Sequence, residues 1–410
     1  MNDSNFQIEQ QCPQCGAPII LDEADRILSC KFCRTRVYLA TNDLFRFYIP
    51  PKEGISENIY FLPYWRIKGL SYTIQGTSVS YKYVDANFLC YDFPQLPYSL
   101  GFRPQALKLR FVGSDNAAGK FIAASPEITS NLLNNFQKRA QHSYQREILI
   151  GETASIIYTP VYIANGRLYD AILKKPLTAK ADDGENERIL DTAPAEKWHV
   201  AFVPLLCPHC GADLPGEKDA LIVFCSNCHS AWNPSDKNFS KVNFSTWPEK
   251  GDDIIYLPFW RMKVKVNGIQ LETYADLIKL ANLPKAPADI WTRTPFYFQA
   301  PAFKVNPSLF LRWCRQLTAT PAQTGLITDL PAKNIYPVTL PLSEALESAF
   351  ITLSSLMKEK YLLDVSSALE FTLEDSMLLL HPFTKSAKEL IHTKLGFSMD
   401  MAALNLGAYL

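Results

Sequence analysis

Eight of the ten cysteines stand in four C-x-x-C pairs, and the spacing of these pairs repeats along the chain. The first set is CPQC at 12–15 with CKFC at 30–33, and the second is CPHC at 207–210 with CSNC at 225–228. Both sets leave 14 residues between their pairs, and one step of 195 positions carries Cys12 onto Cys207. The phrase FLPYWRIK at 61–68 recurs at the same step as YLPFWRMK at 256–263. We interpret this agreement as an internal duplication.

The paired cysteines predict two metal sites. A C-x-x-C turn aims two sulfurs at one point, and two such turns close a tetrahedron around Zn²⁺. A long chain with closely paired cysteines fits metal ligation better than a disulfide framework, and four motifs arranged two and two do not fit a thioredoxin-like redox role. The predicted ligands are Cys12, Cys15, Cys30 and Cys33 for one ion and Cys207, Cys210, Cys225 and Cys228 for the other.

A CPxCG knuckle, a short hairpin and a second CxxC together resemble the zinc-ribbon family, with rubredoxin-like knuckles, over roughly residues 10–40 and 205–235. The resemblance implies two closed sites that hold structural Zn²⁺ and leave no coordination position for catalysis. Rubredoxin-like iron is the alternative ion. The second knuckles depart from the pattern, because Arg34 and His229 stand where glycine is frequent. We interpret His209 and His229 as surface residues beside a site already closed by four thiolates.

Composition narrows the class of protein. A chain of 410 residues implies more than one domain, and its 47% hydrophobic content is typical of a globular protein. The 41 basic and 41 acidic residues balance, which disfavours a nucleic-acid partner held mainly through phosphates. The start MNDSNFQIEQQ lacks a leader pattern, and no apolar run approaches the ~20 residues of a membrane span. We expect a soluble cytoplasmic protein without a transmembrane segment.

The predicted fold class is α+β, with an internal duplication in which each half is a four-cysteine zinc ribbon followed by a mostly antiparallel β-rich domain with one or two helices. Helices are expected to begin at Ser125, Asn306 and Ser343. A hairpin is expected at Asn165-Gly166, with a counterpart of longer turn within 376–396. The predicted divisions are ribbon 1 at 1–45, an α+β domain at 46–175, a linker at 176–197, ribbon 2 at 198–240 and a second α+β domain at 241–410.

The repeated phrase is predicted to form a strand in each half. Alternation places Trp65 and Ile67 on one face and Arg66 and Lys68 on the other. In one interpretation the tryptophans anchor the cores while the basic residues lie on a solvated or inter-domain face. In the other, two equivalent strands contact a partner. The speculative partner-binding residues are then Arg66, Lys68, Arg261 and Lys263.

No catalytic motif stands out. The stretch GSDNAAGKF at 113–121 lacks the spacing of a phosphate loop, and Cys90 and Cys314 are expected to be small buried residues. The remaining histidines are expected on the surface or in the core: His142, His199, His381 and His392. We therefore expect a non-enzymatic, zinc-binding scaffold or adaptor for protein partners. The alternative is a nucleic-acid-associated zinc-ribbon factor of the transcription or translation type.

Overall fold

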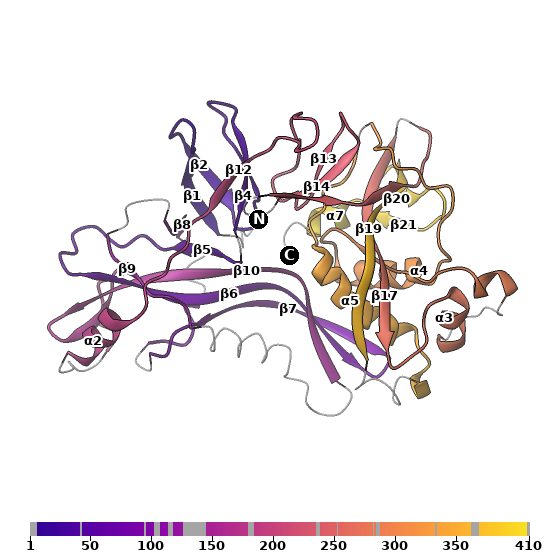
Figure 1. The fold of residues 1–410 in the computed structure, drawn as a ribbon. Helices are drawn as coiled ribbons and strands as arrows, with labels where there is room; N and C mark the ends of the chain where they lie inside the picture. Colours follow the sequence, from indigo (N-terminus) through magenta and orange to yellow (C-terminus); the bar gives the residue numbers. More distant parts are fainter. Residues whose placement is uncertain are drawn as a thin grey trace.

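The computed structural model describes residues 6–41, 43–93, 96–101, 107–113, 118–125, 145–178, 184–234, 238–251, 253–281, 283, 288–332, 334–361 and 369–407. Figure 1 shows two β-rich halves side by side, with the short strands that carry the cysteine pairs above their junction. The helix predicted from Ser125 falls on 126–144, outside the described residues. None of the described helices is long and apolar enough to cross a membrane.

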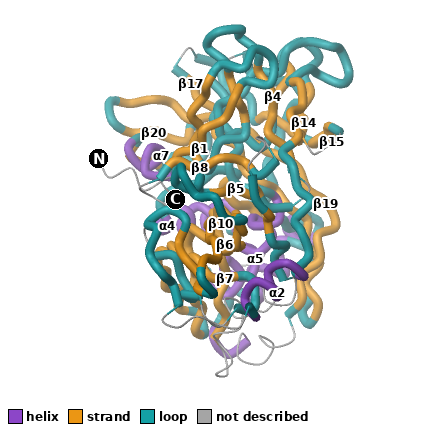
Figure 2. The backbone as a smooth tube through the Cα atoms, turned by 90° about the vertical axis from the view of Figure 1, so that its left-hand side faces the viewer, coloured by secondary structure: helices purple, strands orange, loops and turns teal. Residues whose placement is uncertain are grey.

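The first half is built around two long antiparallel strands, β6 (Ile59–Gln75) and β10 (Gln145–Ala164). In the described part of the chain they belong to a nine-stranded sheet of order β2-β1-β8-β5-β10-β6-β7, which Figure 2 shows from β1 downwards; β9 pairs with β6, and β11 pairs with β10. The other elements are β1 (Gln7–Gln11), β2 (Pro18–Asp22), β5 (Phe45–Tyr48), β7 (Ser78–Leu89), β8 (Lys108–Phe111), β9 (Lys120–Phe121), β11 (Arg167–Asp170) and α2 (Glu185–Thr192). β6 is buried on both faces from Tyr60 to Tyr72.

The second half repeats the long antiparallel pair as β17 (Ile254–Asn267) and β19 (Glu370–Ser386). Helices α4 (Pro307–Thr318) and α5 (Leu342–Leu356) begin where predicted, within one residue, and Asn306 Oδ1 caps α4 by accepting from Ser308 N at 3.0 Å. Trp313 of α4 is fully buried. The other elements are β16 (Phe244–Thr246), α3 (Tyr274–Leu280), η2 (Asp289–Thr292), β18 (Phe298–Pro301), β20 (Glu389–His392), β21 (Ser398–Asp400) and α7 (Ala402–Gly407).

Both halves pair their long strands in the same register. Phe61 lies opposite Pro160, and Tyr256, which is 195 positions after Phe61, lies opposite Pro382. A short strand runs parallel to the second long strand in each half, β5 beside β10 and β16 beside β19. The two sheets therefore share strand directions as well as register.

Backbone hydrogen bonds at the edges of these strands also match. In the first half the donors and acceptors are Cys90 N to Pro63 O, Ile122 N to Phe61 O, Ile49 N to Tyr158 O and Ala171 N to Pro160 O. The corresponding bonds in the second half are Ala302 N to Pro258 O, Tyr336 N to Tyr256 O, Trp247 N to Leu380 O and Thr393 N to Pro382 O. All eight donor–acceptor distances lie between 2.8 and 3.1 Å.

Each half carries a tight hairpin on its second long strand. Asn165 and Gly166 have φ values of 50° and 68°, as a type I′ turn requires, so this predicted hairpin is confirmed. Its counterpart between β19 and β20 was predicted to have a longer turn, which is wrong. Ser386 lies opposite Glu389, leaving two residues in the turn, and Ala387 takes the positive φ of 50° without a glycine.

The predicted first ribbon and the predicted linker are not separate from the domains that they were expected to flank. β1 pairs with β8, so the start of the predicted first ribbon is part of the nine-stranded sheet. The predicted linker at 176–197 contains α2, whose Leu190 is fully buried in an apolar cluster with Tyr60 and Leu62. A short, mostly polar helix has the composition of a linker, which explains why the sequence analysis missed its packing.

Candidate metal centres and the cleft between the halves

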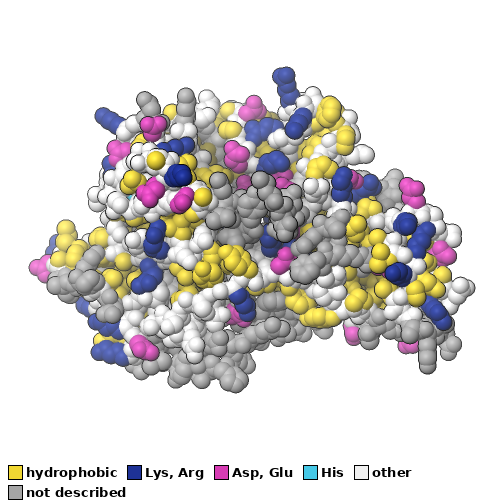
Figure 3. Space-filling view, turned by 180° about the vertical axis from the view of Figure 1, so that it is seen from behind, with side chains coloured by type: hydrophobic (Ala, Val, Ile, Leu, Met, Phe, Trp, Pro, Cys, Tyr) yellow, Lys and Arg dark blue, Asp and Glu magenta, His cyan; other side chains and the backbone are white. Residues whose placement is uncertain are grey.

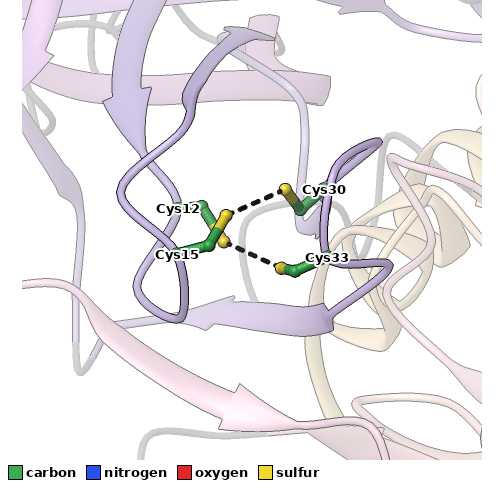
Figure 4. Close-up of side chains that lie close together, drawn as sticks. All are labelled: Cys12, Cys15, Cys30 and Cys33. Atoms are coloured by element: carbon green, nitrogen blue, oxygen red, sulfur yellow. Dashed lines mark hydrogen bonds between the residues drawn. The ribbon is translucent and has the colours of Figure 1, made fainter.

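Each cysteine set brings its four sulfurs to one point, with all Sγ atoms of a set within 4.8 Å of one another. In the first set Cys12 Sγ lies 3.6 Å from Cys33 Sγ, and Cys15 Sγ lies 3.7 Å from Cys30 Sγ (Figure 4). In the second set the corresponding distances are 3.6 Å for Cys207 and Cys228 and 3.5 Å for Cys210 and Cys225. Four metal–sulfur bonds of ~2.3 Å at tetrahedral angles place sulfurs about 3.8 Å apart, whereas disulfide sulfurs lie ~2.05 Å apart. The geometry fits a tetrathiolate metal site in both sets.

The first knuckle of each set is closed by the same backbone bonds. Cys12 N donates to Ala17 O at 2.8 Å, and Cys207 N donates to Ala212 O at 2.7 Å. Gly16 and Gly211 follow with φ values of 72° and 74°, as their position predicts.

The second knuckle of each set closes without glycine. These knuckles lie between β3 (Ile27–Ser29) and β4 (Arg36–Ala40) and between β13 (Val223–Cys225) and β14 (Ser230–Pro234). Arg34 and His229 adopt φ values of 62° and 49°, the left-handed conformation that glycine usually supplies there. His229 is exposed, and its Nδ1 accepts from Leu330 N at 3.0 Å, consistent with its predicted place outside the ligand set.

The two cysteine units pack against each other. β12 (Ala201–Pro204) adds an antiparallel strand to β4, which also pairs with β3. Ile27 N donates to Lys218 O at 2.8 Å, and Arg36 Nη2 donates to Gly216 O at 2.9 Å. Residues 26–40 and 201–234 are called the ribbon pair below. A single apolar cluster lies between its members: Ile27, Tyr38, Ala40, Leu205, Cys207, Leu214, Ala220, Val223 and Cys225.

The first centre joins the ribbon pair to the nine-stranded sheet. Cys12 and Cys15 lie in the loop between β1 and β2, which belong to that sheet. Cys30 and Cys33 lie between β3 and β4 of the ribbon pair. A bound ion therefore links two separately hydrogen-bonded sheets, which is the chemistry expected of a structural metal.

No family model matches this chain, and no match was found among curated proteins or solved structures. The sulfur geometry therefore supports two metal-binding centres directly, while the zinc ribbon remains a resemblance carried by the cysteine motif.

Arg66 and Lys68 are buried. Arg66 is 1% exposed, and its Nη1 donates to Asp85 Oδ1 at 2.6 Å. Its Nη2 lies 3.7 Å from Glu23 Oε1, and the guanidinium lies 4.7 Å from the ring centre of Phe6. Lys68 is 9% exposed. The predicted solvated face is wrong for this strand, because Phe6 and Glu23 cover it. Both residues belong to the predicted first ribbon, so the contact fits the inter-domain face that was the other part of this interpretation.

The second-half counterparts lie in different surroundings. Arg261 is partly buried, with its guanidinium 4.6 Å from the ring centre of Tyr297. Lys263 is exposed and pairs with Glu374 at 3.1 Å. The structure therefore does not make the two basic strands equivalent, and it does not bring their four basic residues together.

Two of the histidines expected on the surface or in the core contact each other. His381 Nδ1 lies 2.8 Å from His392 Nε2, and both side chains are fully buried. His392 Nδ1 accepts from Lys394 N and Leu395 N at 3.1 and 3.2 Å, so the proton of neutral His392 lies on Nε2, which donates to His381. His199 is exposed, Cys90 and Cys314 are buried as expected, and His142 lies outside the described residues.

A cleft of about 450 Å³ lies where the ribbon pair meets both halves. Arg26 and Asp219 line it from the ribbon pair, Glu152 from β10, and Lys304 and Glu344 from the second half. These residues come from segments far apart in the chain. No local motif joins them, which explains why the sequence analysis missed them.

Burial perturbs the titration of three groups in this cleft. Burial raises the pKa of Glu152 to about 8, and the nearby carboxyl of Glu344 adds to the rise. Burial raises the pKa of Glu344 to about 7, although Lys304 and the N–H of Gly151, which donates to Glu344 Oε2, oppose the rise. Burial lowers the pKa of Lys304 to about 8. Groups with such pKa values in a cleft are typical of functional sites.

Proposed function

We propose that this chain is a duplicated, zinc-binding scaffold protein that presents surfaces to protein partners and has no catalytic role. Each half would correspond to one zinc ribbon and one β-rich domain. The matched strand register supports the duplication, as do the four pairs of backbone hydrogen bonds. Ten cysteines without a disulfide suit the reducing cytoplasm, where thiolates remain available to zinc.

The observation that carries the scaffold proposal is Phe32. It lies between ligands Cys30 and Cys33, and its side chain is 74% exposed, the largest value among the exposed large hydrophobic residues of the described chain. An aromatic ring on a metal-fixed turn offers apolar contact area at little loss of conformational entropy, which suits a protein interface.

The chain itself offers a matched control for Phe32. Position 227 is the counterpart of position 32 after the 195-residue step, and it holds an exposed asparagine. A photo-crosslinking phenylalanine analogue at either position would sample an equivalent place on each second knuckle. We expect one defined protein adduct from position 32 and none from position 227 in cells that express the chain natively. Equal crosslinking from both positions, or none from position 32, would contradict the scaffold proposal.

A nucleic-acid factor is the second candidate. The turn between Cys30 and Cys33, which carries Phe32, also favours this function. Lys31 and Arg34 flank Phe32, and the lysine and the ring are exposed, so a base could stack on the ring while its phosphates meet the two cations. Basic and acidic side chains are interspersed on the face shown in Figure 3, which disfavours broad phosphate contacts. Fluorescence anisotropy with a single-stranded oligonucleotide separates the candidates: steeply salt-dependent binding lost in Phe32→Ala would support this second function.

A further inference from the structure

The cleft between the halves has the size and position of a small-molecule site. Its volume of about 450 Å³ lies within the usual range for ligand pockets, and such pockets occur preferentially where domains meet. It is separate from both metal centres, because none of the eight ligand cysteines lines it. We propose that this cleft binds a small organic oxyanion whose carboxylate or phosphate group is held by Arg26 and Lys304.

Arg26 supplies an oriented cation to the cleft. Its guanidinium lies 4.5 Å from the ring centre of Phe45, and Nη1 donates to the carbonyl oxygens of Glu23 and Asp25 at 3.4 and 3.3 Å. Among the described residues, no carboxylate oxygen lies within 4 Å of its guanidinium nitrogens. The ring and the carbonyls fix the position of the guanidinium, and Asp25, Asp219 and Glu23 interact with its charge from a distance. A planar guanidinium suits an oxyanion.

Lys304 supplies the second cation from the opposite half of the chain. Its Nζ donates to Thr153 Oγ1 at 2.9 Å, which directs the ammonium group toward β10. Its pKa is lowered by burial first. Glu344 and Glu23 oppose the shift, and the positive charges of Arg26 and Lys68 add to it. Two cations beside one cleft repel each other, and an anion between them would relieve that repulsion.

The acidic residues around the cleft offset these cations only in part, through Glu344 and Glu23 near Lys304 and Asp219 near Arg26. Glu152, with a pKa of about 8, is mostly protonated at neutral pH, and Glu344, with a pKa of about 7, is about half protonated. Asp43 is already paired with Arg46, whose Nη1 and Nη2 donate to its two oxygens at 2.7 and 2.8 Å. Asp219 is the remaining carboxylate of the lining. A protonated carboxyl group adds a hydrogen-bond donor to the oxyanion site.

Binding of an anion here would take up protons. A negative charge raises the pKa of every titratable group beside it, so Lys304, Glu152 and Glu344 would all shift toward the protonated form. Because their pKa values lie near 7 and 8, the uptake is largest at about pH 8. Net proton uptake distinguishes anion binding in this cleft from anion binding to an ordinary surface cation, because a surface lysine or arginine is already fully protonated at that pH.

The test is isothermal titration calorimetry of the metal-loaded full chain at pH 8, in Tris and in HEPES, with succinate and inorganic phosphate as separate probes. Sodium chloride at equal ionic strength gives the baseline. We expect saturable binding of at least one probe, with an observed enthalpy that differs between the buffers in the direction of proton uptake. The two probes show whether a carboxylate or a phosphate is preferred.

Two variants locate the binding. Arg26→Gln and Lys304→Met are each expected to weaken it by about tenfold or more, the effect of losing one charge-assisted hydrogen bond. Arg188→Gln changes an exposed arginine of α2 and is expected to leave binding unchanged. Absence of saturable binding, proton release, or wild-type affinity in both cleft variants would overturn the proposal. If neither variant folds, the direction of proton exchange in the wild type decides.

Discussion

Replacing His392 by asparagine is expected to make the folded chain less sensitive to mild acid. His392 cannot gain a proton without loss of structure, because Nδ1 accepts two backbone N–H groups and Nε2 already donates to His381. Burial lowers its pKa from an ordinary value of 6.5 to about 4. The folded state therefore binds fewer protons than the unfolded chain below pH 6.5. Stability falls as the pH falls toward 4.

The size of this effect follows from the two pKa values of His392. With 6.5 in the unfolded chain and about 4 in the folded chain, the free energy of unfolding drops by about 1.4 kcal/mol between pH 8 and pH 5.5. His381 adds to the loss, because burial, His392 and Arg261 all lower its pKa. Lys394 lies near His392 and lowers its pKa further.

The assay is urea unfolding at 25 °C, compared at pH 8 and pH 5.5 for wild type, His392→Asn and His199→Asn. Asparagine offers an oxygen to the turn amides in place of Nδ1 and does not titrate, and His199 is an exposed control. Protonation of the metal ligands affects all three proteins and cancels in the comparison. The wild type and His199→Asn should lose about 1.4 kcal/mol more than His392→Asn. Equal losses in all three would refute the reasoning.

Three further changes test the packing around the centres. Cys30→Ser should reduce bound metal by one equivalent and lower the melting temperature of the whole chain, since the first centre joins two sheets; metal analysis and calorimetry check both results. Arg66→Met should destabilise by about 1–3 kcal/mol in urea unfolding, since buried Glu23 loses one of its neighbouring cations, whereas Lys263→Met should stay within about 0.5 kcal/mol. Gly216→Ala should destabilise by about 1–3 kcal/mol in the same assay, because a Cβ there would meet Ile27 Cδ1 at 2.7 Å.

The cysteine spacing predicted the turns that hold the metal ligands, because these turns depend on residues close together in the chain. A knuckle is closed by bonds between residues five positions apart, such as Cys12 and Ala17, so the sequence contains nearly everything that the turn needs. The helix that begins after Asn306 was equally predictable, because its cap and first-turn proline are adjacent in the chain. Even at Arg34 and His229, where glycine is absent, the closed ring of four sulfurs forms.

Long-range packing was not predictable in the same way. Alternation identified which residues share a face of β6, but nothing near Arg66 indicates that Glu23 and Phe6 cover that face. The contact between His381 and His392 depends on the two-residue turn after Ser386, and expecting a longer turn concealed it. The cleft combines residues as distant as Arg26 and Glu344, so only the packed structure identifies it.

The most direct test of the whole account is the metal content of the purified chain, combined with X-ray absorption at the metal edge. The account predicts two zinc ions per chain, each with four sulfur ligands at ~2.3 Å and no nitrogen or oxygen in its coordination shell. Folded protein without bound metal, or with its eight paired cysteines oxidised to disulfides, would contradict it.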